Sequence, residues 1–227
     1  MTTKSPKPKS EKKPADSPTR GVQARAQTTR DRILRAAIKV FSKKGFDGGS
    51  VEAISKLSRS HDRMIYYYFG SKEKLFVEAL ETVYQRMNEA ETALDIDIDN
   101  PREALEKIVH FHWQYYREHP EFLFLLNDEN LHEGKHLKKK SPRTEAVFPP
   151  AVNLLDAVLR AGAGQGLFRP DIQALDLYIA IAALGYFYLS NRYTLSAFLQ
   201  TDLMEPEPLA HWPGFATDLV LRLVSSN

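Results

Sequence analysis

A short pattern in the middle of the chain matches a zinc-binding motif. Residues 132–136 read His-Glu-Gly-Lys-His, which fits the H-E-x-x-H pattern of many metalloproteases. On a helix, His132 and His136 would share one face and bind one metal ion, and Glu133 would activate a bound water. A zinc-dependent hydrolase is therefore the first functional hypothesis.

The residues around this motif argue against the hydrolase. The extended motif requires glycine and histidine three and six residues after His136, where the chain has Lys139 and Pro142. Gly134 weakens the helix that would align the two histidines, and three consecutive lysines nearby repel a dication. We therefore favour a solvated helix end and expect no metal, cofactor or catalytic residue. The hydrolase remains an alternative that only the elements around the motif can decide.

Charge is distributed unevenly along the 227 residues, although the net charge is only +2. Residues 1–74 contain 18 Lys and Arg against 7 Asp and Glu, whereas residues 75–227 contain 13 against 22. A basic block beside an acidic one is typical of a nucleic-acid-binding module joined to a body that does not contact phosphates. Residues 1–26 are predicted to be a disordered basic tail, since Lys, Pro and Ser dominate their start.

The composition also limits where the protein is expected to act. The chain has no cysteine, which excludes disulfides and thiolate metal sites and agrees with a reducing compartment. Its start lacks the apolar core of a signal peptide. The longest apolar run, Leu177 to Leu189, has 13 residues, whereas roughly 20 are needed to span a bilayer. We expect a cytoplasmic protein without a membrane partner.

Apolar residues recur at helical spacing, and no stretch alternates long enough for a strand, so the predicted fold class is all-α. A first helix begins at Thr29 and ends at Gly45, and a long helix runs from Ser71 to about Leu94. Two short helices separated by a turn lie between them, over residues 50–69, and form a helix-turn-helix. Later helices are predicted over 101–119 and 120–134, from 144 with a restart at 149–150, after a cap at Asp171, and within 206–224.

The second short helix, HDRMIYYYF, carries three consecutive tyrosines. A buried face of Ile65, Tyr68 and Phe69 leaves Tyr66 and Tyr67 for DNA, where a phenol can bond a phosphate or contact a thymine methyl. Arg63 and Met64 precede them by one turn, and Lys72 in the next helix can bind a phosphate. Whether Arg63 contacts guanine or only phosphate stays open.

Residues 27–87 resemble the N-terminal domain of the TetR family of bacterial transcriptional regulators. The resemblance rests on Ile-Leu-x-Ala-Ala-x-x-x-Phe at 33–41, Gly-Phe at 45–46, Ile-Tyr-x-Tyr-Phe at 65–69 and Ser-Lys-Glu-x-Leu at 71–75. It implies base contacts from Asp62, Arg63, Met64 and Tyr67, and phosphate contacts from Ser50, Tyr66 and Lys72. Members usually have Ala-Gly-Val-Ser in the turn, whereas this chain has Ser-Arg-Ser-His at 58–61, which predicts an atypical operator.

The same resemblance implies that residues 88–227 form a helical ligand-binding and dimerisation domain. The apolar run at 177–189 supports this independently, since a helix without a polar face must be covered on every side and a second subunit is the simplest cover. A homodimer would place two reading helices about one DNA turn apart on a palindromic operator. A fully internal helix of a monomer is the alternative.

Aromatic and polar residues are concentrated in the middle helices, where the family places its ligand pocket. Packing explains most of the aromatic residues, but scattered polar groups in an apolar interior also orient small ligands. The segment 120–134 also resembles family members that regulate pyrimidine and nicotinate-type catabolism, which implies a small aromatic or heterocyclic effector. The predicted ligand-binding residues are His112, Trp113, Tyr116, Asn127, Asn130 and Tyr178. The predicted function is an effector-released repressor, and an effector-independent DNA-binding protein is the other alternative.

Overall fold

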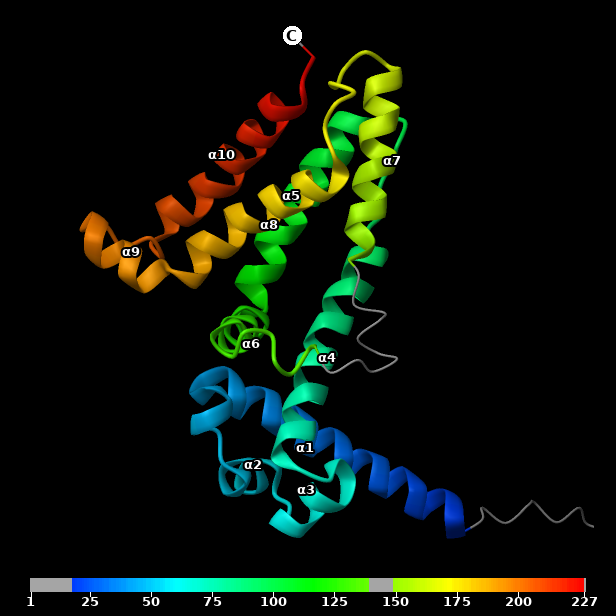
Figure 1. Ribbon diagram of the computed structural model, residues 1–227, viewed down its shortest axis with the longest axis vertical. Helices are drawn as coiled ribbons and strands as arrows, with labels where there is room; N and C mark the ends of the chain where they lie inside the picture. Colours follow the sequence, from blue (N-terminus) through cyan, green and yellow to red (C-terminus); the bar gives the residue numbers. More distant parts are fainter. Residues whose placement is uncertain (1–17, 139–148, 227) are drawn as a thin grey trace, which may run out of the picture.

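A computed structural model describes residues 18–138 and 149–226, with side chains described from residue 27 onward. The molecule is elongated, with α1 to α3 at one end and α5, α7, α8 and α10 at the other (Figure 1). Within the described residues all regular structure is helical, apart from one isolated bridge between Phe168 and Ser225. The helices are α1 (Pro18–Gly48), α2 (Val51–Ser58), α3 (Asp62–Phe69), α4 (Lys72–Thr92), α5 (Pro101–Glu118), α6 (Pro120–Leu131), α7 (Pro150–Gly164), α8 (Ala174–Ser190), α9 (Arg192–Leu199) and α10 (Pro206–Val224).

The first domain packs α1, α2 and α3 around the beginning of α4. Its core contains fully buried Ile33, Phe41, Ile54, Ile65 and Phe76. Ser50 caps α2 by accepting a hydrogen bond from the backbone N–H of Ala53, at 3.1 Å, and Ser71 caps α4 in the same way. The predicted helix-turn-helix and the boundaries of the long helix are therefore confirmed.

The long helix α4 leaves this first domain and continues into the second (Figure 1). There α5 packs against α7, α8 and α10, around the buried side chains of Leu105, Ile108, Leu155 and Val220. Helix α6 lies between the two domains and packs against both α1 and α8. Motion of one domain relative to the other must therefore involve α4 or α6.

Three sequence-based predictions need correction. Helix α1 begins at Pro18, so residues 18–26 are helical rather than part of a disordered tail; their Gln, Ala and Arg residues favour helix. Asp171 pairs with Arg169 at 2.6 Å and does not cap α8, which begins three residues later. Helix α9 was not predicted, because its eight residues carry no clear cap signal. The predicted start of a helix at residue 144 lies outside the described residues.

In the part of the chain that the structure describes, no single helix is both long and apolar enough to cross a membrane. Helices α8 and α9 reach that length and composition only as a pair, and their axes are bent by 71°.

Candidate functional site

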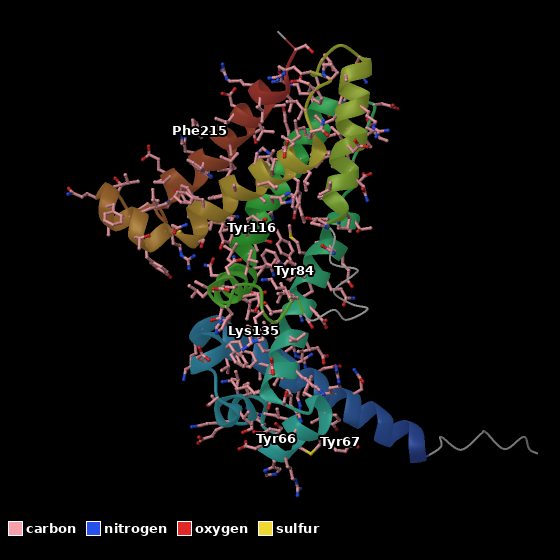
Figure 2. All side chains as sticks on the ribbon, in the orientation of Figure 1. Tyr66, Tyr67, Tyr84, Tyr116, Lys135 and Phe215 are labelled. Atoms are coloured by element: carbon pink, nitrogen blue, oxygen red, sulfur yellow. The ribbon has the colours of Figure 1, made fainter. Side chains whose placement is uncertain are left out.

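Helix α3 presents two tyrosines at the end of the molecule. Ile65 and Phe69 are buried in the first domain, as the sequence predicts, whereas Tyr66 is 53% exposed and Tyr67 77% exposed. Figure 2 shows both tyrosines on the side of this domain that faces away from the rest of the molecule. The exposed face of α3 is thus free to enter a DNA groove.

The side chain of Arg30 links α1 to both α4 and α3. Arg30 on α1 binds the carboxylate of Glu78 on α4 at 2.5 Å, and its guanidinium lies 4.8 Å from the ring centre of Phe69. Charged hydrogen bonds of this kind combine strength with directional geometry. The exposed tyrosines are therefore carried by a helix that is fixed from behind.

The predicted DNA contacts lie around this face, with one exception. Asp62 and Arg63 are exposed at the beginning of α3, while Met64 is half-buried and packs against the core. The Ser50 oxygen is used as the cap of α2, but its hydroxyl proton can still be donated to a phosphate. Met64 has less surface to offer a base than the sequence suggested.

Lys72 is tied to the far end of α1. Its ammonium lies 4.6 Å from the ring centre of Phe46 and donates to the carbonyl oxygen of Asp47 at 3.4 Å. Cation–π contacts of this type hold a lysine head in place without neutralising its charge. A phosphate contact by Lys72 therefore depends on where the end of α1 lies.

The turn of the helix-turn-helix has a strained residue at the position where family members usually have glycine. Arg59 has φ 52° and ψ 44°, the left-handed conformation, and caps the end of α2. Arg59 also lines a basic surface hollow, which the sequence did not predict. Its charged members are Arg32, Arg35, Lys39 and Arg59.

A polar pair is buried where α4 and α5 meet in the second domain. Glu91 and His112 have side chains that are 0% and 1% exposed, and Glu91 Oε1 lies 3.4 Å from His112 Nε2. Neither of these two atoms has a hydrogen-bond partner among the residues that the structure describes. The other oxygen of Glu91 accepts from the backbone N–H of Ala151 in the first turn of α7, at 3.2 Å.

The bonding of the His112 ring limits what this pair can bind. His112 Nδ1 lies 2.9 Å from the carbonyl oxygen of Ile108. A carbonyl only accepts, so we assign the proton to Nδ1, and in the neutral ring Nε2 is then an acceptor. In the neutral ring, Glu91 Oε1 and His112 Nε2 are therefore two acceptors that face each other, whereas a protonated ring would form an ion pair with the carboxylate. Buried polar atoms left in this way cost about 1–3 kcal/mol each.

Tyrosines surround the pair. The ring of His112 lies 5.7 Å from that of Tyr178 and 6.0 Å from that of Tyr116. Burial, and secondarily the charge of Glu129, raises the pKa of Tyr84 to about 12. Burial likewise raises the pKa values of Tyr116 and Tyr178. All three hydroxyls therefore remain protonated at neutral pH, and Figure 2 places Tyr84 and Tyr116 in the middle of the molecule.

Four of the six predicted ligand residues lie near this interior. Trp113 is 5% exposed, its indole N–H is buried without a partner among the described residues, and its ring lies 5.2 Å from that of Tyr188. Asn127 instead links α6 to α8 through the Tyr186 hydroxyl and the Ser190 hydroxyl. Asn130 is exposed, which does not suit a buried site. Glu91 was missed because a single glutamate near the end of a helix carries no sequence signal.

The zinc-motif match does not form a metal site. Glu133 and Gly134 have φ values of 56° and 69°, so the two histidines do not lie on one helix. His136 is 1% exposed and donates from Nδ1 to Glu129 at 2.7 Å, so the expected solvated helix end was wrong for this residue. Across residues 27–138 and 149–226 no three His, Asp or Glu side chains are placed to hold a metal ion.

A stripe of exposed apolar side chains covers the outer side of α8 and α10. Its members are between 43% and 59% exposed, and Figure 2 shows Phe215 on the outer side of α10. On α8 they are spaced by four or eight residues, which places them on one face. The stripe consists of Leu175, Ile179, Phe187, Phe215, Leu219 and Leu223. An apolar surface of this kind marks an interaction site.

The first domain has a helix-turn-helix with an exposed face on α3, and it is joined to a helical domain with buried polar residues. These two features define a DNA-binding regulator. Residues 33–79 match the family described as bacterial regulatory proteins, tetR family, and residues 101–220 match the tetracyclin repressor-like C-terminal domain. The chain belongs to the TetR family of ligand-responsive DNA-binding transcriptional regulators.

Similar proteins include two named transcriptional repressors. The repressor NicS of Pseudomonas putida is 52% identical over 203 residues, covering 89% of this chain and 95% of NicS. The repressor SCO4008 of Streptomyces coelicolor is 27% identical over 160 residues, covering 70% of this chain and 77% of its own.

Solved structures share the fold at lower sequence identity. The transcriptional regulator SCO4942 of Streptomyces coelicolor has a TM-score of 0.63 at 20% identity, covering 86% of this chain and 98% of its own. A TetR family regulator of Marinobacter aquaeolei has a TM-score of 0.62 at 20% identity, covering 90% of this chain and 100% of its own.

Proposed function

We propose that the protein is a homodimeric repressor that leaves a palindromic operator when a small aromatic effector binds beside Glu91 and His112. As a DNA-binding regulator it would act in the cytoplasm. The similarity to the repressor NicS supports repression rather than activation. The observation that carries the effector site is the buried pair of Glu91 and His112, whose facing atoms lie 3.4 Å apart and have no hydrogen-bond partner among the described residues.

DNA reading is assigned to the exposed face of α3. Tyr67 and Arg63 are directed at bases, whereas Tyr66, Ser50 and Lys72 bind the backbone; these roles suit their exposure and the basic charge of the domain. The basic hollow beside Arg59 adds phosphate contacts. Most of the affinity would come from phosphates, and most of the sequence preference from α3.

The effector is expected to bring a hydrogen-bond donor into the aromatic interior. Two N–H or O–H donors, one directed at Glu91 Oε1 and one at the neutral His112 Nε2, would satisfy both acceptors. The 3.4 Å separation suits two donors on neighbouring atoms, as in the fork with which a guanidinium meets a carboxylate. Tyr116 and Tyr178 would pack against the ring of the ligand. No described lysine or arginine is paired with Glu91, so a negative group would be disfavoured at this end of the site.

Dimerisation is assigned to the stripe on α8 and α10. A four-helix bundle with the same helices of a second copy would cover all six apolar side chains at once, because a two-fold interface uses the same surface twice. It would also fix the distance between the two α3 helices, as a palindromic site requires.

DNA selection from a random library, followed by fluorescence anisotropy at two salt concentrations, tests the first half of the proposal. We expect a palindrome that binds far more tightly than scrambled DNA. Tyr67→Ala should reduce this preference, whereas Lys107→Ala, an exposed change on α5, should not. A protein without sequence preference would refute DNA reading by α3.

Effector release is tested with matched probes on the selected DNA. Catechol carries two adjacent O–H donors, and 1,2-dimethoxybenzene has the same ring with the donors methylated. We expect only donor-bearing rings to release DNA, and Glu91→Gln to abolish release while operator affinity stays unchanged, because the new amide would donate to His112 itself. Equal release by methylated and free rings, or release that persists in Glu91→Gln, would contradict the assigned effector site. A regulator that no aromatic probe releases would be an effector-independent DNA-binding protein.

A further inference from the structure

The end of α1 contains a break that is held from outside its own domain. Gly45 has φ 68° and ψ −179°, so the helix is interrupted there and the chain turns through Phe46 and Asp47. We call residues 45–47 the α1 corner. Helix α6 packs against α1, and the corner is one place where the two helices bond to each other.

One carboxylate of α6 bonds directly to the backbone of the corner. Asp128 Oδ2 accepts the backbone N–H of Phe46 at 2.8 Å. The same carboxylate lies so close to Gly45 that a Cβ there would collide with it. Glycine is therefore required at residue 45 both by its positive φ and by the approach of Asp128. A hydrogen bond from a charged acceptor to a backbone N–H is short and directional.

Two histidines of the former zinc match enclose the ring of Phe46. The ring centre of Phe46 lies 5.9 Å from that of His132 and 4.9 Å from that of His136. Buried Glu129 holds His136 in place through its Nδ1–H at 2.7 Å and its backbone N–H at 2.7 Å. His132 also reaches Asp47, at 3.4 Å. Residues of the segment 128–136 therefore contact the α1 corner through both hydrogen bonds and ring packing.

The corner leads to both functional regions. On the DNA side, Lys72 lies on the Phe46 ring and bonds the Asp47 carbonyl. On the other side, Asn127, adjacent to Asp128, is bonded to Tyr186 and Ser190 of α8. Consecutive residues of α6 therefore attach to the ligand-binding domain and to the DNA-binding domain.

We propose that Asp128 is a positioning residue that locks the DNA-binding domain at one angle to the second domain and so sets the half-site spacing that the dimer accepts. The spacing part of this proposal rests on the proposed function; the locking part does not. Asp128 lies on α6 and belongs neither to the proposed DNA-reading face of α3 nor to the pair of Glu91 and His112. Without it, the corner keeps the ring contacts of Phe46 with His132 and His136 and the 3.4 Å contact of His132 with Asp47, but no bond from α6 to its backbone.

The absence of cysteine makes the locking directly measurable. Cysteines introduced at exposed Lys56 on α2 and exposed Arg160 on α7 carry two spin labels, and dilution with unlabelled protein isolates distances within one protomer. Double electron–electron resonance then reports how narrowly the two domains are held. Asp128→Ala should broaden this distance distribution about twofold, whereas Asp128→Asn, which keeps an acceptor for Phe46 N–H, should restore most of the wild-type width.

The matched control is Leu131→Ala, also near the end of α6 and 84% exposed, which should leave the distribution unchanged. His132→Ala is the milder second variant if Asp128→Ala fails to fold, because it removes one contact to the corner without leaving a backbone donor unbonded. An unchanged distribution in the folded variants overturns the proposal, whatever the DNA results are.

Half-site spacing gives the second readout. On the selected palindrome, insertion or deletion of one base pair between half-sites should weaken wild-type binding about tenfold, and Asp128→Ala should reduce this discrimination about fivefold. A merely structural residue would weaken binding to all spacings equally. Retained discrimination overturns the spacing role. If the protein selects no DNA while Asp128→Ala still broadens the distances, the proposed function has failed and the lock stands.

Discussion

The carboxylate of Asp128 occupies the space that a side chain at Gly45 would need. Gly45 and Asp128 belong to different domains and are 83 positions apart in the sequence. Because Gly45 has no side chain, Asp128 can approach its backbone. The helix break at Gly45 and the acidic residue on α6 are therefore a single feature of the structure.

Gly45→Ala is expected to lower the free energy of unfolding by about 1–3 kcal/mol, because a Cβ at positive φ is strained and would displace Asp128. Urea denaturation monitored by circular dichroism measures this change. Gly48→Ala is the matched control, since its Cβ would make only an ordinary contact of 3.4 Å with Lys44. Equal effects at the two positions would contradict the role given to the Asp128 contact.

Arg59→Gly is expected to stabilise the fold by about 0.5–1 kcal/mol, because glycine adopts the left-handed conformation of the turn without strain. The same change should weaken DNA binding, since one cation beside the basic hollow is lost. Arg59→Ala separates the two effects: it removes the charge and keeps the strain. Urea denaturation measures the free energy of unfolding, and anisotropy on the selected DNA measures the affinity. A loss of stability in the glycine variant would contradict the backbone strain assigned to Arg59.

Lys72→Ala is expected to weaken binding to all DNA sequences by a similar factor and to reduce the slope of log K against log salt by about one per subunit. The reason is that Lys72 is proposed to bind a phosphate, which would release one counterion. Salt titrations by anisotropy provide the measurement, with Lys107→Ala as a charge-matched control. A change in sequence preference with an unchanged slope would show that Lys72 does not bind a phosphate.

Ile179→Arg is expected to produce monomers and to reduce operator affinity at least tenfold, because a charge in the centre of the apolar stripe cannot be buried unpaired. Light scattering coupled to gel filtration measures the mass of the particle. Leu131→Arg introduces the same charge at a more exposed position outside the stripe and should leave the mass unchanged. If Ile179→Arg stays dimeric, the subunits associate through another surface.

The contribution of His132 to stability should depend on pH. Its Nδ1 donates to the Asp128 carbonyl at 2.8 Å and its Nε2 faces Asp47, so the backbone bond first, and the carboxylate second, raise its pKa. Because the folded-state pKa is the higher one, the stabilisation is complete below about pH 6, under the unfolded pKa of about 6.5. It is lost as pH rises through the folded value.

The measurement compares thermal unfolding of wild type with His132→Phe, which keeps a ring beside Phe46 but does not titrate. The difference in melting temperature should be largest at low pH and shrink as pH rises. A difference that is independent of pH would mean that the ring contact, and not the charge, stabilises the corner.

The sequence by itself determined most of the helices and the exposed face of α3. Apolar spacing, the caps Ser50 and Ser71 and the proline at the first position of α5, Pro101, placed these helices, because periodicity and capping are local properties of the chain. The alternation of buried and exposed residues in 61–69 separated Ile65 and Phe69 from Tyr66 and Tyr67 for the same reason. The uneven charge identified the end of the molecule that faces DNA.

Only the tertiary structure decided which distant residues act together. The pairing of Glu91 with His112, and the contact of Asp128 with the α1 corner, join segments that have no local signal for each other. The match to a zinc motif failed because Gly134 breaks the helix it assumes and Glu129 takes the Nδ1 of His136. Hydrogen bonds and burial depend on how helices pack, and packing is a property of the whole chain.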